Sequence, residues 1–283
     1  MTKGQTGAVL VVVLALVFST AGIFTKAVDA VAWNIIFWRG VSASAFTVGY
    51  LALRGALVRE VMVFGRPALA VAVMMAAGTA AFIPAFKLTA VANVALIYGA
   101  APFLAALLAW GYLRELSSLT VALASLAAFA GVVLIVSGSF AGNAWQGDLL
   151  ALFMTLMMAG TMVVYRARPA TTAALPAALS SVLLLPPAFY LGEPFSVTPA
   201  EIPLLVLFGL VFAVASVTLS EGARRLPASE TALLSILEMP LAPMLAFAIL
   251  AERPSLEVVT GGAVVFAAVL WSQKPKVRGR RSQ

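Results

Sequence analysis

Residues 224–256 read RRLPASETALLSILEMPLAPMLAFAILAERPSL, and a second apolar run continues from there to Trp271. The two apolar limbs, about 228–250 and 255–272, are each long enough to cross the roughly 30 Å hydrocarbon core of a bilayer at about 1.5 Å of rise per residue. The stretch therefore predicts a hairpin of two membrane-spanning helices joined by a short polar turn.

This hairpin occurs twice in the chain. Shifting it back by 137 or 138 positions brings it onto an earlier stretch that repeats its prolines, its turn and several of its apolar residues. Such self-similarity at a fixed distance indicates an internal duplication. The matching pairs are Leu88 and Leu226, Ala90 and Ala228, Pro102 and Pro240, Glu115 and Glu252, Ser118 and Ser255, Leu119 and Leu256, Val121 and Val258, and Phe129 and Phe266.

The composition is that of an integral membrane protein. Of the 283 residues, 63% are hydrophobic and 10% are charged, and the mean hydropathy is +1.05. A soluble domain carries about 25% charged residues. The chain has no cysteine and no histidine, which excludes disulfides, haem, iron–sulfur clusters, the usual zinc sites and histidine proton relays. We therefore expect no cofactor and no metal.

Ten apolar segments are helix candidates, because every backbone amide in lipid must find its partner within the segment. The first could instead be a signal peptide, since Lys3 precedes it and residues 19–21 loosely resemble a cleavage site. Its echo 140 residues later, with Gly7 on Gly147, favours a helix of the fold. The approximate limits are 7–25, 31–53, 68–87, 90–113, 119–138, 147–165, 170–191, 202–220, 228–250 and 255–272.

The Lys and Arg residues are divided unequally between the two sides of the predicted membrane. If the N-terminus is cytoplasmic, fourteen of the 18 lie on the cytoplasmic side, and only Lys26, Lys87 and Arg253 lie on the other. This bias predicts that both termini are cytoplasmic. It also explains the net charge of +7 without a nucleic-acid partner. The basic tail, residues 274–283, is expected to lie near anionic lipid.

The two echoes define two repeats of five helices, residues 1–138 and 147–273, joined by an uncharged linker. An odd number of crossings makes the second copy enter the membrane from the opposite side. The predicted fold is therefore all-α, a polytopic membrane protein with ten transmembrane helices in two inverted repeats. Inverted repeats suit a protein that presents one central site to either side in turn. The alternative is a duplication that only doubled a stable bundle.

The fourth and ninth segments end in similar motifs, Leu-Arg-Glu-Leu-Ser-Ser-Leu at 113–119 and Leu-Ala-Glu-Arg-Pro-Ser-Leu at 250–256. With these motifs and ten duplicated helices, the chain resembles the EamA-type transporters of the drug/metabolite transporter superfamily over nearly its whole length, the tail excepted. Among bacterial members it looks most like the YddG-type exporters of aromatic amino acids.

The resemblance implies an exporter of a metabolite or amino acid in the bacterial inner membrane. It implies a central cavity lined mainly by helices other than the fifth and tenth. It also implies glycines near the ends of those two helices, which are matched by Gly131 and, earlier in the tenth helix, by Gly261 and Gly262.

Two charged residues stand out because they lie deep inside predicted membrane helices, where a charge costs about 2.5–3.5 kcal/mol on insertion scales. Arg39 lies about 12 Å from the outer end of the second helix, and Glu238 lies about 12 Å from the inner end of the ninth. In a core of roughly 30 Å their depths differ by about 6 Å, so both could flank one cavity. The alternatives are an Arg39 that snorkels to the interface beside Trp33 and Trp38, and a purely structural carboxyl at Glu238.

The ninth segment also has a polar face, and such a face in a membrane helix points to protein or water. Pro102 and Pro240 each release a backbone carbonyl one turn earlier and would kink the fourth and ninth helices, although a kink can be purely structural. The polar or aromatic residues on this face and on the mirrored part of the fourth helix are Thr231, Ser235, Glu238, Asn93 and Tyr98.

Further cavity candidates occur at helical spacing on the third, sixth and eighth segments. Aromatic and methionine side chains would suit a flat, apolar substrate, and ordinary packing is the alternative. These candidates are Thr79, Phe82, Thr155, Met158 and Ser216.

The sequence thus predicts a secondary transporter that exports a small metabolite, such as an aromatic or other neutral amino acid, by alternating access. Glu238 would meet a substrate amine or a proton, and Arg39 a substrate carboxylate. A broad exporter of drugs or metabolites is the alternative. An intramembrane lipid enzyme is remote, because no paired carboxylates, nucleophile–base spacing or metal-ligand cluster supports catalysis. The expected partners are a small-molecule substrate and membrane lipids, and the chain would be a monomer or a homodimer.

Overall fold

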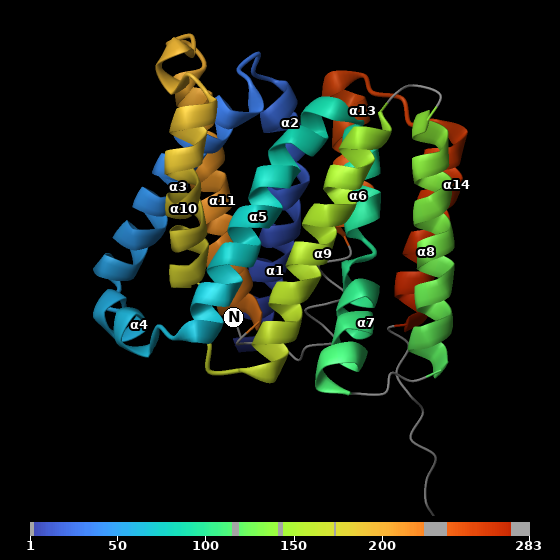
Figure 1. Cartoon of the computed structure of the whole chain (residues 1–283), viewed down its shortest axis with the longest axis horizontal. Helices are drawn as coiled ribbons and strands as arrows, with labels where there is room; N and C mark the ends of the chain where they lie inside the picture. Colours follow the sequence, from blue (N-terminus) through green and yellow to red (C-terminus); the bar gives the residue numbers. More distant parts are fainter. Residues whose placement is uncertain (1–2, 115–118, 141–143, 173, 224–236, 273–283) are drawn as a thin grey trace, which may run out of the picture.

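The computed structural model of the chain is a bundle of helices (Figure 1). It describes residues 3–114, 119–140, 144–172, 174–223 and 237–272, and these ranges contain no strand. Seven helical segments of the described chain are long and apolar enough to cross a membrane, and three shorter apolar helices accompany them. The predicted class, an all-α polytopic membrane protein of about ten spans, is confirmed.

The helices follow the predicted segments. In the first half they are α1 (Lys3–Ser19), α2 (Ala21–Lys26), α3 (Ala32–Leu53), α4 (Leu57–Val63), α5 (Arg66–Leu88), α6 (Val91–Tyr98), α7 (Ala101–Leu113) and α8 (Leu119–Phe140). In the second half they are α9 (Trp145–Ala167), α10 (Ala174–Leu191), the 3₁₀ turn η1 (Pro194–Ser196), α11 (Ile202–Ala223), α13 (Glu238–Leu250) and α14 (Leu256–Ser272).

One short helix, α4, was not predicted. It connects the second and third spans, and its side chains are mostly exposed except for that of Glu60. The Glu60 carboxylate accepts a hydrogen bond of 3.0 Å from the backbone N–H of Leu175. That N–H belongs to the first turn of α10, where helices leave backbone donors without an intrahelical partner. The acid therefore ties α4 to the start of α10.

The fourth span is interrupted as the sequence predicted. Helix α6 ends at Tyr98 and α7 begins at Ala101, with Pro102 in its first turn. Proline has no N–H, and its ring clashes with the carbonyl four residues earlier, which is that of Tyr98, so the helix ends there. In the ninth span α13 begins at Glu238, two residues before Pro240. The turn before it belongs to residues 224–236, outside the described residues.

The loops fall into two groups at opposite ends of the bundle. At the end away from Lys3, the Thr89 hydroxyl donates a bond of 2.7 Å to Asp148, and the backbone N–H of Asp29 donates one of 2.7 Å to Glu201. We call this the distal end. It is formed by residues 26–31, 87–91, 145–148, 192–201 and 251–256.

The two halves enter the bundle from opposite ends. Helices α1 and α2 run towards the distal end and finish there at Lys26, whereas α9, the predicted counterpart of α1, begins there at Trp145. The packing of the spans is consistent with the predicted duplication. Helix α5 packs against α9, and their predicted counterparts, α11 and α1, also pack against each other. The repeat boundaries at 138 and 147 stay a prediction.

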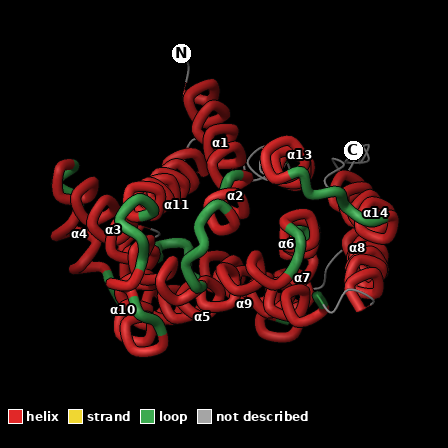
Figure 2. The backbone as a smooth tube through the Cα atoms, turned by 90° about the horizontal axis from the view of Figure 1, so that it is seen from above, coloured by secondary structure: helices red, strands yellow, loops and turns green. Residues whose placement is uncertain are grey.

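Helices α8 and α14, the fifth and tenth spans, lie together at one edge of the molecule (Figure 2). Their backbones approach closely at two of the predicted glycines. A Cβ added to Gly131 would lie 2.6 Å from the carbonyl oxygen of Gly261, and a Cβ added to Gly261 would lie 2.5 Å from that of Gly131. Small residues allow this approach in membrane helices, where close packing replaces the hydrophobic effect.

We expect Gly131→Ala to lower the stability of the protein by about 1–3 kcal/mol, because the new methyl group must push α14 away. Gly111→Ala in α7 is the matched control, since no atom lies within 4 Å of its added Cβ. Thermal unfolding of the purified protein in detergent measures both. Equal melting temperatures for the two variants would contradict the proposed contact.

Candidate functional site

A cavity of about 220 Å³ lies among the spans of both halves. Its lining comes from α1, α2, α3, α5, α6, α9, α10, α11 and α13, and none of the described residues of α8 or α14 contributes. Many of these residues come from the middle of their helices, such as Thr79 of α5, Met158 of α9 and Phe212 of α11. The cavity therefore lies inside the bundle, away from the two spans at its edge.

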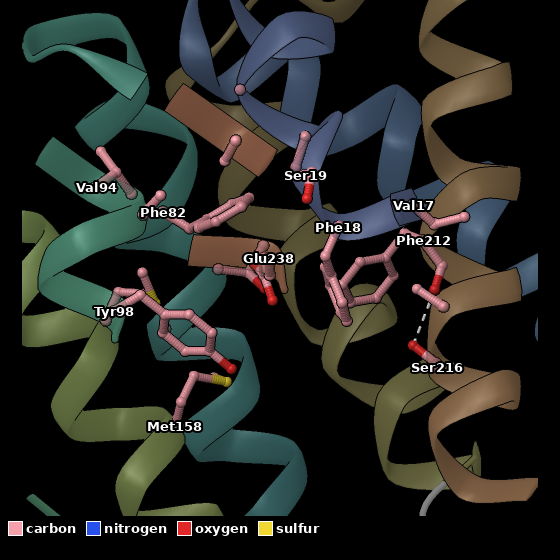
Figure 3. A pocket seen from close by; sticks show the side chains of 18 of the residues that line it. Val17, Phe18, Ser19, Phe82, Val94, Tyr98, Met158, Phe212, Ser216 and Glu238 are labelled. Atoms are coloured by element: carbon pink, nitrogen blue, oxygen red, sulfur yellow. Dashed lines mark hydrogen bonds between the residues drawn. The ribbon is translucent and has the colours of Figure 1, made fainter. Parts of the chain in front are cut away.

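Seven predicted site residues line this one cavity, although they come from six different helices. They contribute two charges, two hydroxyl groups, a phenol, a phenyl ring and a thioether. Several of them surround the open space in Figure 3. The seven are Arg39, Thr79, Phe82, Tyr98, Met158, Ser216 and Glu238.

The interrupted fourth span and the start of α13 bring Tyr98 and Glu238 into the cavity. Helices α6 and α13 pack against each other, and a Cβ added to Gly99 would overlap the Met239 side chain. Tyr98 is the last residue of α6 and Glu238 is the first residue of α13. A helix N-terminus carries a partial positive charge, which favours a carboxylate in its first turn. These two helix ends thus supply two of the polar groups in a largely apolar space.

Glu238 projects into the space between Phe18 and Phe82 (Figure 3). Within the part of the chain that the structure describes, its carboxylate forms no ion pair and no hydrogen bond. A carboxylate in an apolar surrounding requires a partner to offset its lost hydration. Glu238 is therefore available to a cation, an amine or a proton that enters the cavity.

Arg39 is buried, with 1% of its surface exposed. Its guanidinium carbon lies 4.4 Å from the ring centre of Phe212 and 5.4 Å from that of Phe208. The alternative in which this side chain snorkels to the interface is therefore wrong. Cation–π contacts contribute about 0.5–2 kcal/mol, against an insertion cost of about 2.5–3.5 kcal/mol for a charge at the centre of a membrane helix. Two such contacts can offset much of this cost, but the rings provide no ordinary hydrogen-bond acceptor for the guanidinium N–H groups.

Asn93 and Thr155 do not reach the cavity. The Asn93 amide donates hydrogen bonds of 2.8 Å to Ser139 and 3.0 Å to Asp148, so it joins α6, α8 and α9 near the distal end. The Thr155 hydroxyl is buried and donates a bond of 2.7 Å to the carbonyl of Ala151 in its own helix. The Asn93 amide N–H and the Thr155 hydroxyl thus bond to other protein groups, which a sequence pattern cannot distinguish from exposure to a cavity. Thr231 and Ser235 lie outside the described residues.

Sequence reasoning missed the contribution of the first span. Phe18 lines the cavity and meets Phe212 edge to face, with the ring centres 6.3 Å apart. Phe208, which also lines the cavity, stacks on Phe24 at 5.2 Å. The span around Phe18 is apolar on all sides, so no periodic pattern distinguished its cavity face.

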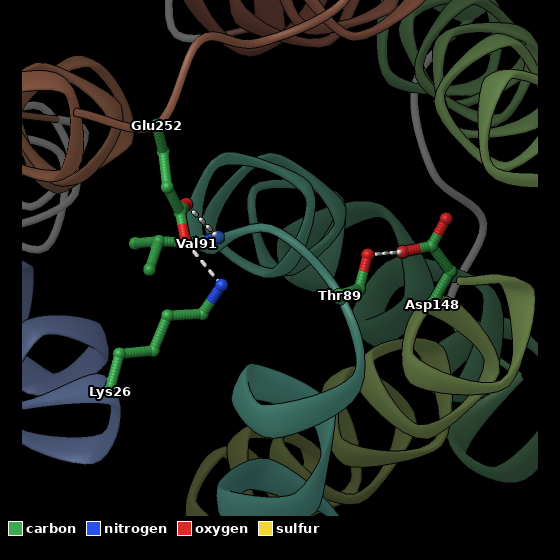
Figure 4. A network of polar contacts seen from close by, with 5 residues as sticks. All are labelled: Lys26, Thr89, Val91, Asp148 and Glu252. Carbon is green, nitrogen blue, oxygen red and sulfur yellow. Dashed lines mark hydrogen bonds and ion pairs between the residues drawn. The ribbon is translucent and has the colours of Figure 1, made fainter. Parts of the chain in front are cut away.

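The distal boundary of the cavity is closely packed. A Cβ added to Gly22 would lie 2.7 Å from the Val91 side chain and 2.9 Å from that of Phe86, and all three residues line the cavity. Beside this contact, Lys26 forms an ion pair with Glu252, whose second oxygen accepts a hydrogen bond of 2.9 Å from the backbone N–H of Val91 (Figure 4). Glu252 therefore joins the end of α2 to the start of α6.

The distal side also contains a second buried network. The Asp148 carboxylate accepts from the Thr89 hydroxyl and from the Asn93 amide, and Asp148 is fully buried (Figure 4). These bonds connect the start of α9 to the link between α5 and α6. Together with the Lys26–Glu252 pair they tie four spans at this end.

Comparisons with known proteins agree with the fold. Residues 145–272, most of the second predicted repeat, match the EamA-like transporter family. A solved crystal structure is similar over 99% of this chain and 100% of that chain, with a TM-score of 0.69 and 19% sequence identity, which concerns the fold alone. A comparison with curated proteins found no match. The family match supports the drug/metabolite transporter superfamily and implies a membrane transporter of small substrates.

Proposed function

We propose that the chain is a secondary transporter that exports small metabolites across the bacterial inner membrane, with aromatic or other neutral amino acids as its substrates. The observation that carries this proposal is the cavity of about 220 Å³, which is lined by spans of both halves. It contains one acid and one base, and neither has an ionic partner among the described residues. The EamA-like match over residues 145–272 supports transport of a small molecule. The YddG-type likeness supports an amino acid.

The size and lining of the cavity favour a metabolite. Pockets for drug-sized ligands measure about 300–1,000 Å³, which is more than this cavity offers. Its walls consist largely of Phe, Met, Val and Ala side chains, which suit an apolar or aromatic group. A broad drug exporter stays the alternative, and competition between amino acids and larger drugs for binding to the purified protein distinguishes the two.

Within this proposal Glu238 binds the substrate amine or carries a proton. Its carboxylate projects into the cavity without a described protein partner, so a positively charged group can approach it directly. The neighbouring Tyr98 hydroxyl adds one hydrogen-bonding group at the same break between half-helices. Discontinuous helices with polar ends at the site are a common arrangement in transporters with inverted repeats.

Alternating access requires a gate at each end of the cavity. We assign the distal gate to the contact of Gly22, Phe86 and Val91 with the ion pair of Lys26 and Glu252 beside it. The positive-inside bias favours a distal end that faces away from the cytoplasm. In that orientation, this conformer is closed towards the outside.

We expect Glu238→Gln to reduce export by about tenfold or more, because loss of one partner of a buried charged contact weakens binding strongly. Efflux of labelled phenylalanine from cells that express the protein measures the effect. Glu193→Gln, the same change at an exposed carboxylate, is the control and should export normally. Normal efflux by well-expressed Glu238→Gln protein would remove the proposed role of Glu238.

The gate can be tested with thiol chemistry, because the natural chain has no cysteine. A single cysteine at Val94 in the cavity should react slowly with a membrane-impermeant thiol reagent added on the distal side. Glu252→Gln or Lys26→Met should raise that rate by about threefold or more, because either change removes the ion pair.

Arg253→Gln is the control for this experiment, since Arg253 is exposed and adjacent to Glu252. Glu252→Gln keeps an oxygen that can accept from the Val91 N–H, so its effect reports the ion pair and not the helix start. Identical labelling rates in all variants would show that the ion pair does not hold the distal end closed.

A further inference from the structure

The backbone around Arg39 is held rigidly between two helices. A Cβ added to Gly209 of α11 would overlap the Ser42 hydroxyl and lie 2.7 Å from the Arg39 carbonyl oxygen. On the other side, a Cβ added to Gly40 would lie 3.3 Å from the carbonyl oxygen of Ser181 in α10. Helix α3 therefore cannot shift easily at this level, and the position of the Arg39 side chain is determined by packing.

Among the described residues, the Arg39 guanidinium has no counter-ion. Phe208 and Phe212 contact it, while its Nε and Nη1 atoms are buried and have no acceptor among the described residues. Phenyl rings interact with the charge but cannot accept its N–H groups as a carboxylate does. Glu238, the one acid among the described lining residues, forms no ion pair with it. The described residues therefore supply no anion for Arg39, and a bound ligand can supply one.

We infer that Arg39 is the carboxylate-binding residue of the cavity, and that the ligand is a small organic carboxylate whose apolar part lies against the aromatic wall. This inference rests on the proposed function and assigns the residue that binds the carboxylate of its substrate. Arg39 is the only Lys or Arg among the described lining residues, which matches a single negative charge. A phosphate carries about 1.5–2 negative charges, which the single positive charge of one guanidinium would balance only in part.

The aromatic contacts explain how such a site can stay closed without its ligand. Phe212 covers the guanidinium at 4.4 Å and also contacts Phe18 of α1. A carboxylate reaches the N–H groups of Arg39 when the Phe212 ring turns aside. The ring would then lie against the apolar part of the ligand. The Phe212 side chain thus covers Arg39 in the empty cavity and contacts the ligand in the occupied one.

Binding of three related probes to the purified full-length protein tests the inference. L-Phenylalanine carries both charges, L-phenylalaninamide lacks the carboxylate, and 3-phenylpropionate lacks the amine. Arg39→Gln should weaken binding of phenylalanine and phenylpropionate by about tenfold or more and leave the amide unchanged. Glu238→Gln is the matched variant and should show the opposite selectivity between the amide and phenylpropionate.

The stability of the unliganded protein separates a ligand-binding role from a structural one. Arg39→Gln removes an unpaired buried charge, so its melting temperature without ligand should equal or exceed that of the natural protein. A large fall in the melting temperature of Arg39→Gln, together with loss of binding of all three probes, would indicate a structural role. If Arg39→Lys then restored binding of none of the probes, the inference would be overturned.

The remaining outcomes also decide between the two proposals. Unchanged binding of both carboxylates to Arg39→Gln overturns the inference while export by the natural protein can still stand. Failure of the natural protein to bind either carboxylate overturns it as well. Binding of carboxylates that depends on Arg39, in a protein that exports no amino acid, supports the inference and contradicts the proposed function.

Discussion

The absence of water in the hydrocarbon core is the constraint on which the rest of this structure depends. Every backbone amide must be satisfied within its own helix, and every charge there needs a specific reason to persist. The described chain obeys the first condition almost throughout, and it departs from regular helix where Pro102 interrupts the fourth span. Tyr98 lines the cavity at this interruption, and Glu238 at the start of α13 lines the same cavity.

The predicted duplication accounts for the paired packing of the spans, and the differences between the two predicted repeats account for the charges in the cavity. The pairs α5 with α9 and α1 with α11 are counterparts, and the two spans at the edge pack glycine against glycine. Arg39 and Glu238 have no charged counterpart in the other repeat. Positions that match between the predicted repeats thus maintain the scaffold. Arg39 and Glu238, which have no such match, provide the charges to which we assign substrate binding.

The distal end and the cavity have different physical characters. Close to the distal surface, Lys26 pairs with Glu252 in one network, and Thr89 bonds to Asp148 in a second. Inside the cavity the two charges have no described ionic partner. Paired charges resist opening and unpaired charges attract a ligand, so the arrangement fits a site that is closed on one side and empty within.

The sequence by itself determined the membrane class and most of the membrane-spanning segments, because hydropathy is visible along the chain. It also predicted the inverted duplication from repeat spacing and, from charge and helical spacing, seven residues that line the cavity. Only the tertiary structure decided that Asn93 and Thr155 bond locally, that Phe18 faces the cavity, and that Arg39 lies under Phe212 and not at the interface. The reason is physical: a helix that is apolar on every side gives no signal of which face meets a cavity, and a hydroxyl or amide can satisfy its hydrogen bonds within its own helix or against a neighbour.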